Sequence, residues 1–115
     1  MSTIIGTFYF KQTNSGNLIG EFTNNNMSGI STESADITSN YKMKFEGTYE
    51  TTWFEENMNQ KLTLEIKVKE TKSRLIYKLF WKKNEIIKFC GIGFIVGKKL
   101  IGYYTDDKKT CGNTV

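Results

Sequence analysis

Residues 41–53 read YKMKFEGTYETTW and alternate strictly between two kinds of side chain. The odd positions, from Tyr41 to Trp53, are mostly aromatic or apolar, whereas the even positions are all Lys, Glu or Thr. A period of two is typical of a β-strand with one buried and one solvated face. The sequence therefore predicts a long strand over 41–53, with Gly47 as the place where the strand bends.

The same alternation recurs along the chain. Residues 61–69 form a second clear strand pattern, and five further segments give weaker versions of it: 4–11, 17–23, 74–83, 86–96 and 99–105. We expect a weak strand at 27–32, and a loop with at most one helical turn at 31–40. Tight connections between amphipathic strands predict an antiparallel meander, and closure into a barrel hides its edges. The prediction is an all-β, up-and-down antiparallel barrel of about seven to eight strands. It forms a single domain over 1–106, followed by a mobile C-terminal tail over 107–115.

The composition excludes several kinds of chemistry. The 115 residues include no histidine and no proline. Without histidine there is no Ser-His-Asp triad, no imidazole metal ligand and no usual proton shuttle at neutral pH. Residues 91–97, GIGFIVG, lack the Lys and Ser/Thr of a phosphate loop. We interpret their glycines as places where the strand bends sharply or where a neighbouring aromatic ring lies against its backbone. We therefore expect no cofactor, no metal and no enzyme. A carboxyl group of strongly raised pKa inside a cavity would indicate the opposite.

The N-terminal residues and the cysteines bear on location. Residues 1–6 carry no basic leader, and no run approaches the roughly 20 apolar residues of a membrane span. Two cysteines do not make a disulfide framework. We interpret Cys90 as a small buried apolar residue, and leave open whether it pairs with Cys111. A cytoplasmic, reduced protein is the expectation.

The net charge of +4 is unevenly distributed, with −4 over residues 1–66 and +8 over residues 67–115. Aromatic and basic residues interleave in the basic half, a pattern that single-strand nucleic-acid barrels use for stacking and phosphate contact. The residues concerned are Tyr77, Phe80, Trp81, Lys82, Lys83 and Phe89. Most of the lysines alternate with apolar residues as a solvated face does, so nucleic-acid binding is the lesser alternative.

The strands within 74–105 are apolar on both faces. Ile92 and Phe94 share one face of 86–96, while Phe89 and Ile95 share the other. Because a monomeric barrel buries only one face of each strand, the second face needs a cover. A homo-oligomer interface on the outer face of 74–105 is the expected cover, and a tail or loop packed over the outside is the alternative.

The chain start, Ile5-Gly6-Thr7-Phe8, resembles the opening of the calycin barrels: lipocalins, fatty-acid-binding proteins and avidins. In those families a Gly-x-aromatic sequence, usually ending in Trp, begins the first strand, and Phe8 stands there in this chain. Residues 14–22, NSGNLIGEF, are similar to the first hairpin of avidin-type barrels, and Gly-x-aromatic recurs at 20–22 and 47–49. The resemblance implies a calycin-like barrel that can bind a ligand in its interior, and it assigns no site residues.

The first function hypothesis is a noncatalytic protein that holds a small, largely apolar ligand inside the barrel. An eight-stranded barrel either is filled by its side chains or encloses one small ligand. The alternative is therefore an oligomeric structural or protein-interaction module with a filled core. The candidate ligand-binding residues are the inward-facing aromatic side chains Tyr41, Phe45, Tyr49, Trp53, Tyr77 and Trp81.

Overall fold

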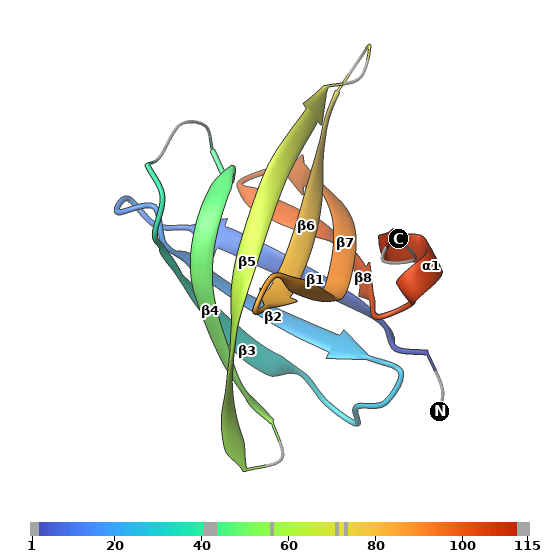
Figure 1. Ribbon diagram of the computed structural model, residues 1–115. Coiled ribbons are helices and arrows are strands. Elements are labelled where there is room, and N and C mark those ends of the chain that lie inside the picture. Colours follow the sequence, from blue (N-terminus) through green and yellow to red (C-terminus); the bar gives the residue numbers. More distant parts are fainter. Residues whose placement is uncertain (1–2, 41–43, 56, 71, 73, 113–115) are drawn as a thin grey trace.

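Eight antiparallel strands form one closed barrel in the computed structural model, which describes residues 3–40, 44–55, 57–70, 72 and 74–112. Each strand pairs with the next in the sequence, and β8 closes the barrel against β1 (Figure 1). The predicted all-β, up-and-down barrel is therefore confirmed. The strands are β1 (Ile5–Gln12), β2 (Leu18–Asn24), β3 (Ser31–Ile37), β4 (Gly47–Glu55), β5 (Met58–Glu70), β6 (Leu75–Lys83), β7 (Ile86–Val96) and β8 (Lys99–Thr105).

Large apolar side chains from alternate strand positions form a core in the interior of the barrel. The period-two pattern places Tyr49 and Thr51 of β4 inside, both fully buried, and leaves Glu50 between them exposed. On β7, Gly91 faces inward, where a Cβ would lie 3.4 Å from the ring of Trp81 and 2.5 Å from a backbone oxygen of β8. The glycine thus allows the backbone of β8 to approach closely, while the ring of Trp81 lies at ordinary contact distance.

The fourth strand is shorter than the alternation predicts. It begins at Gly47 rather than at Tyr41, because Phe45 has a φ of 67° and breaks the extended chain. Phe45 then turns its ring into the barrel, where the ring meets Tyr77 edge to face at a centroid distance of 6.1 Å. The pattern continues past the strand because the loop residue is itself part of the core. Tyr41 lies outside the described residues.

The third strand occupies a segment that the sequence marks as a loop. β3 spans Ser31–Ile37, whereas the prediction placed a weak strand at 27–32 and a loop at 31–40. Its inward positions are Glu33, Ala35 and Ile37, so only the last of them is a large apolar residue. Pairing with β2 on one side and β4 on the other holds this polar segment in the sheet, so the tertiary context overrides a weak local preference.

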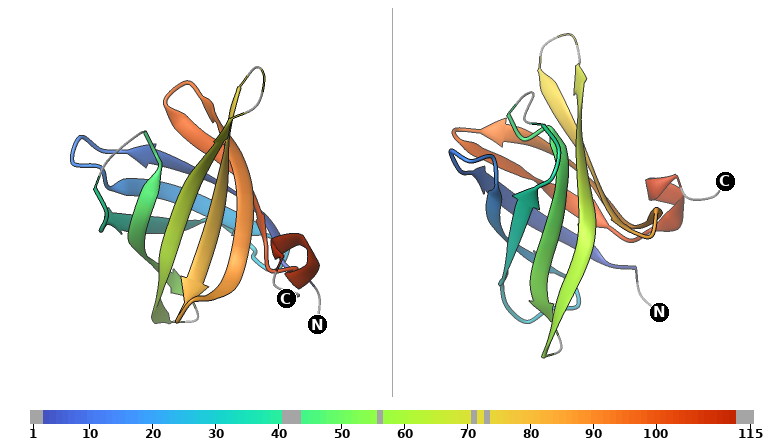
Figure 2. Two further views of the ribbon diagram at one scale, coloured as in Figure 1. Left: turned by 45° about the horizontal axis from the view of Figure 1, so that its top comes forward. Right: turned by 60° about the vertical axis from the view of Figure 1, so that its left-hand side comes forward.

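A short helix follows the barrel. α1 (Lys108–Cys111) packs outside the barrel wall against β7, as both views in Figure 2 show. Cys111 forms a disulfide with Cys90, which points outward from β7. The tail predicted over 107–115 thus carries a helix bonded to the barrel, and its residues 113–115 lie outside the described residues.

Membrane-spanning helices are absent from the described part of the chain, where no helix is long and apolar enough to cross a bilayer. The only helix described, α1, has four residues.

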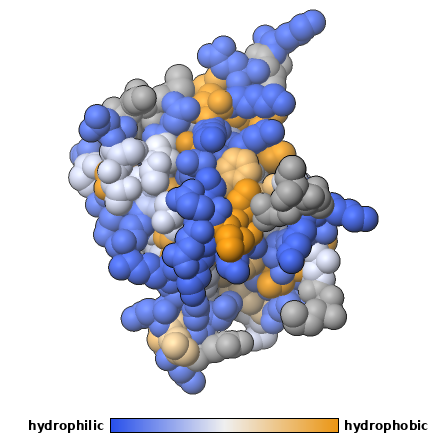
Figure 3. Space-filling model, in the orientation of Figure 1, coloured by the Kyte–Doolittle hydropathy of each residue, from blue (hydrophilic) through white to orange (hydrophobic). Residues whose placement is uncertain are grey.

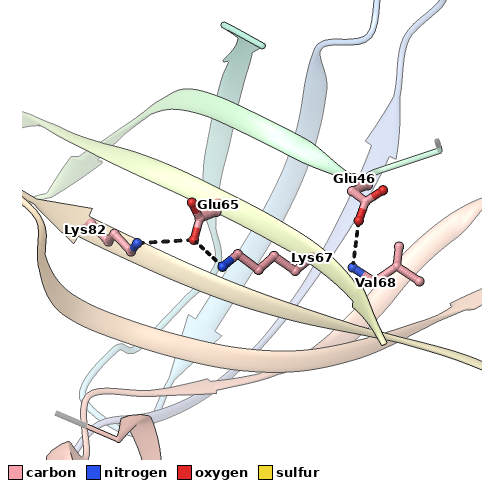
Figure 4. A network of polar contacts seen from close by, with 5 residues as sticks. All are labelled: Glu46, Glu65, Lys67, Val68 and Lys82. Carbon is pink, nitrogen blue, oxygen red and sulfur yellow. Dashed lines mark hydrogen bonds and ion pairs between the residues drawn. The ribbon is translucent and has the colours of Figure 1, made fainter. Parts of the chain in front are cut away.

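The outer faces of β5 and β6 carry an ion-pair network (Figure 4). Glu65 Oε1 lies 3.2 Å from Lys82 Nζ and 3.5 Å from Lys67 Nζ. Partial burial acts to raise the pKa of Glu65, but the hydrogen bond and charge of Lys82, with the charge of Lys67, outweigh it and hold this pKa below its usual value. Beside this network, Glu46 accepts a hydrogen bond from the backbone N–H of Val68 at 3.2 Å, which ties the loop before β4 to β5.

Candidate functional site

One end of the barrel interior is completely filled. Phe45, Tyr49 and Tyr77 are buried there, and no more than 1% of any of these residues is exposed. The Tyr49 hydroxyl donates to the backbone oxygen of Phe45 at 2.8 Å and accepts from Gln12 Nε2 at 3.0 Å. Gln12 Oε1 in turn accepts from the Phe45 N–H at 2.7 Å. These paired polar groups close this end, which we call the closed end, and leave it as ordinary core.

The opposite end holds a cavity of about 70 Å³, which we call the open-end pocket. A space of this size takes about two water molecules, at roughly 30 Å³ each, or a ligand with a similarly small buried part. Trp53 at its wall is half-buried and Glu55 at its rim is exposed, so the pocket opens to solvent. Its lining residues come from seven strands and the segment before β1: Ile4, Phe8, Phe22, Asn24, Glu33, Trp53, Glu55, Trp81, Phe89 and Tyr104.

Six aromatic rings form most of the wall, and they contact one another around the pocket. Tyr104 lies at the centre of this set, with ring-centroid distances of 5.8 Å to Trp81, 5.9 Å to Phe89 and 6.2 Å to Phe22. Phe8 contacts Trp81 and Phe22 contacts Trp53, mostly edge to face. Edge-to-face contacts hold aromatic rings in fixed orientations, so the wall is preorganised.

A carboxyl group projects into this aromatic wall. Glu33 of β3 is only 5% exposed, and its Oε2 accepts hydrogen bonds from Thr51 Oγ1 and from Trp81 Nε1, the latter at 2.9 Å. Burial raises the pKa of Glu33 from 4.5 to about 7, although the hydrogen bonds from Thr51 and Trp81 act to lower it. Near neutral pH this carboxyl group is therefore close to half ionised.

A second polar pair lies in the same pocket. Asn24 Nδ2 donates to the Tyr104 hydroxyl at 2.9 Å. Burial raises the pKa of Tyr104 above its usual value; the hydrogen bond from Asn24 lowers it, and the negative charges of Glu33 and Glu55 raise it further. Tyr104 thus stays neutral over the physiological range and contributes a fixed hydroxyl dipole to the pocket.

The barrel divides the residues predicted for ligand binding between its two ends. Trp53 and Trp81 line the open-end pocket. Phe45, Tyr49 and Tyr77 are fully buried in the closed end, where the rings of Phe45 and Tyr77 pack edge to face. Tyr41 falls outside the described residues. Both tryptophans of the chain therefore belong to the pocket.

Sequence reasoning missed Glu33, which lay in a segment taken for a loop. The alternation of Glu33, Ala35 and Ile37 with Thr32, Ser34 and Asp36 was the available signal. The inward carboxyl group has the raised pKa that we associated with an enzyme. The geometry of Glu33 suits hydrogen bonding or ion pairing to a ligand.

The outer faces of β7 and β8 form a second candidate surface. Ile92, Phe94, Val96 and Tyr103 point outward and are between 41% and 49% exposed. Figure 3 shows hydrophobic atoms among hydrophilic ones on the face that carries β6 and β7. α1 packs beside this surface, and a cleft between the helix and the barrel is lined in part by Phe80, Ile92 and Tyr103. The sequence suggested that either an oligomer interface or a packed tail shields this apolar surface. In the structure α1 shields only part of it.

The basic and aromatic residues considered for nucleic-acid binding do not form one surface. Tyr77 and Trp81 point into the barrel and are buried, while Lys82 and Lys83 lie on or near its exterior. Bases that stack on side chains need exposed rings beside the phosphate contacts.

No protein-family model, curated protein or solved structure matches the chain. The closed eight-stranded antiparallel barrel is compatible with the calycin-like architecture that the first strand suggested.

Proposed function

We propose that this chain is a noncatalytic binding protein that holds a small, largely apolar ligand in the open-end pocket. The observation that carries the proposal is the contrast between the two ends of the barrel. Side chains fill the closed end, whereas six aromatic rings at the other end surround unfilled space that opens to solvent. Ligand sites are typically concave, mainly apolar, and contain a few fixed polar groups. Glu33, Asn24 and the Tyr104 hydroxyl are such groups in this pocket.

Native mass spectrometry of freshly purified protein, beside a denatured control, tests this proposal. We expect a discrete mass excess over the 13.3 kDa chain that disappears on denaturation. A Trp53→Ala variant removes one wall of the pocket and is expected to lose this excess, while Phe54→Ala, an exposed neighbour, is expected to keep it. A bare chain in every preparation, together with no change of tryptophan fluorescence on addition of small apolar compounds, would contradict the proposal.

The outer apolar surface supports a second candidate function, a homo-oligomer through the outer face of strands 74–105. The half-exposed Ile92, Phe94, Val96 and Tyr103 favour it, because contiguous apolar side chains on a barrel exterior are typical of contact surfaces. Gel filtration with multi-angle light scattering gives the mass in solution. A dimer that Phe94→Lys converts to a monomer would support this function, and a wild-type monomer at high concentration would contradict it.

The disulfide provides a way to test the cellular compartment. We propose that the protein works where Cys90 and Cys111 stay oxidised, rather than in the reduced cytoplasm. Alkylation of free thiols in fresh lysate, followed by mass measurement, distinguishes the two. An unlabelled chain supports an oxidising compartment, and two labels per chain support the cytoplasm.

A further inference from the structure

The charges in the open-end pocket are all of one sign. Its described lining residues include two carboxylates, Glu33 and Glu55, and no lysine or arginine. This is unexpected in a chain of net charge +4, most of whose lysines lie on the outer surface. We propose that the pocket binds a small organic cation, a protonated amine with an apolar body, and that Glu33 is its counter-ion. This inference rests on the proposed function and specifies the chemical class of its ligand.

The hydrogen bonds of Glu33 leave one oxygen for a ligand. Both hydrogen bonds that the carboxyl group accepts, from Thr51 and Trp81, go to Oε2. Oε1 accepts no hydrogen bond from any described residue. Every fully enclosed side-chain oxygen among those residues does have a hydrogen-bond partner, so Oε1 is not fully enclosed. Oε1 therefore keeps contact with the cavity that Glu33 lines. An ammonium group that reaches this oxygen makes a charge-assisted hydrogen bond, which is stronger than one between neutral groups.

The aromatic wall suits the same class of ligand. The face of an aromatic ring carries negative electrostatic potential and attracts cations, most strongly for Trp. Trp53, Trp81 and Tyr104 all line the pocket, together with three phenylalanines. A neutral apolar ligand would use the apolar area of these rings but would cover Oε1 without pairing it, at a cost in free energy. An anion would meet Glu33 and Glu55 with no compensating positive charge among the described lining residues.

The titration of Glu33 gives this proposal a pH signature. Because the pKa of Glu33 is about 7, its carboxyl group is ionised in few of the molecules at pH 5.5 and in most of them at pH 8. The other titratable groups that line the pocket are Glu55 at its rim and Tyr104, and Tyr104 stays neutral in this range. A ligand that needs the ionised carboxylate therefore binds about thirtyfold more tightly at pH 8 than at pH 5.5.

Titration with three probes of matched size tests the inference: benzylamine, benzyl alcohol and benzoate. The ammonium or hydroxyl group can enter the cavity while the ring occupies the open mouth. Tryptophan fluorescence reports on the pocket alone, since both tryptophans of the chain line it. At pH 8 we expect benzylamine to bind about tenfold or more tightly than benzyl alcohol, and benzoate to bind most weakly.

Two variants connect this preference to one carboxyl group. Glu33→Gln keeps an oxygen that can accept from Thr51 and Trp81, but it removes the charge. We expect it to bind benzylamine and benzyl alcohol equally and to lose the pH dependence of benzylamine binding. Glu70→Gln, which removes an exposed carboxylate at the end of β5, is expected to behave as wild type.

The outcomes separate the inference from the proposed function. Equal binding of benzylamine and benzyl alcohol to wild-type protein would overturn the cation inference and leave an apolar binding site. A preference for benzoate, or a benzylamine preference that survives in Glu33→Gln, would also overturn it. If none of the three probes changes the tryptophan fluorescence, the proposed function fails and the inference fails with it.

Discussion

The substitution Glu33→Gln is expected to change how the stability of the barrel depends on pH. The folded protein holds the Glu33 carboxyl group with a pKa of about 7, against an ordinary value of 4.5 that we assign to the unfolded chain. Below pH 4.5 both states are protonated and the group contributes no difference. Between pH 4.5 and pH 7, the Glu33 carboxyl group loses its proton in the unfolded chain before it does so in the folded protein. Folding therefore becomes progressively less favourable as the pH rises, until the folded state also ionises above pH 7.

The size of the effect follows from the two pKa values. Each pKa unit corresponds to about 1.4 kcal/mol, so the whole difference is worth about 3 kcal/mol. About 2.5 kcal/mol of it falls between pH 5 and pH 8. Glutamine does not titrate, and the other ionisable groups are common to both proteins. The stability of Glu33→Gln relative to wild type is therefore expected to rise by about 2.5 kcal/mol between these two pH values.

Urea unfolding at half-unit steps of pH from 5 to 8, with the disulfide intact, measures this difference. The free energy of unfolding of each protein comes from linear extrapolation. The Glu70→Gln variant is the matched control, because it removes an exposed carboxylate and is expected to track wild type. A difference between Glu33→Gln and wild type that stays constant with pH would refute the reasoning, since it would mean that Glu33 ionises as freely in the barrel as in water.

Three further predictions address the disulfide, the Glu33 hydrogen bonds and the closed end. Replacement of Cys90 and Cys111 by Ser removes a cross-link over 21 residues and is expected to lower the free energy of unfolding by about 3 kcal/mol; two reactive thiols per wild-type chain, before any reduction, would contradict it. Trp81→Phe removes the indole donor to Glu33, so the pKa of Glu33 rises and the pH-dependent loss of stability extends to higher pH in the same urea series; an unchanged window would contradict it. Tyr49→Phe removes a hydroxyl that is hydrogen-bonded to the Phe45 carbonyl and to Gln12. It is expected to lower the free energy of unfolding by about 1–2 kcal/mol and to leave benzyl alcohol binding unchanged. Loss of binding in this variant would place the ligand in the closed end.

The barrel could be predicted because it follows from patterns local to each strand. The alternation in 61–69, 86–96 and 99–105 identifies inward and outward residues without any knowledge of partners, and β7 and β8 begin and end where the pattern does. A meander of such strands has few ways to hide its edges, so closure was predictable as well.

β3 could not be predicted from its own sequence pattern, because pairing with the neighbouring strands fixes its place in the sheet. Glu33 and Ala35 are poor strand formers, and their inward orientation depends on pairing with β2 and β4. The role of Glu33 was missed with the strand. An inward carboxyl group in a polar segment resembles a solvated loop residue until the opposite wall, with Thr51 and Trp81, is in place.

The division of the barrel into a filled and an open end is also beyond sequence patterns. Alternation shows that Tyr49, Trp53, Tyr77 and Trp81 face inward, but not how far along the axis each one lies. The left-handed backbone at Phe45 decides which end is filled, because it turns that ring into the interior beside Tyr77. A non-glycine residue with positive φ leaves no clear signature in the sequence.

The most direct test of the open-end pocket is a two-dimensional ¹H–¹⁵N NMR titration with benzyl alcohol. The chain has two indole N–H groups, those of Trp53 and Trp81, and both belong to the pocket. We predict that both indole signals shift and saturate with a single dissociation constant, while the backbone amides of Tyr49 and Tyr77 in the closed end do not move. Indole signals that stay in place while amides of the outer face of β7 and β8 shift would contradict the account and assign binding to the barrel exterior.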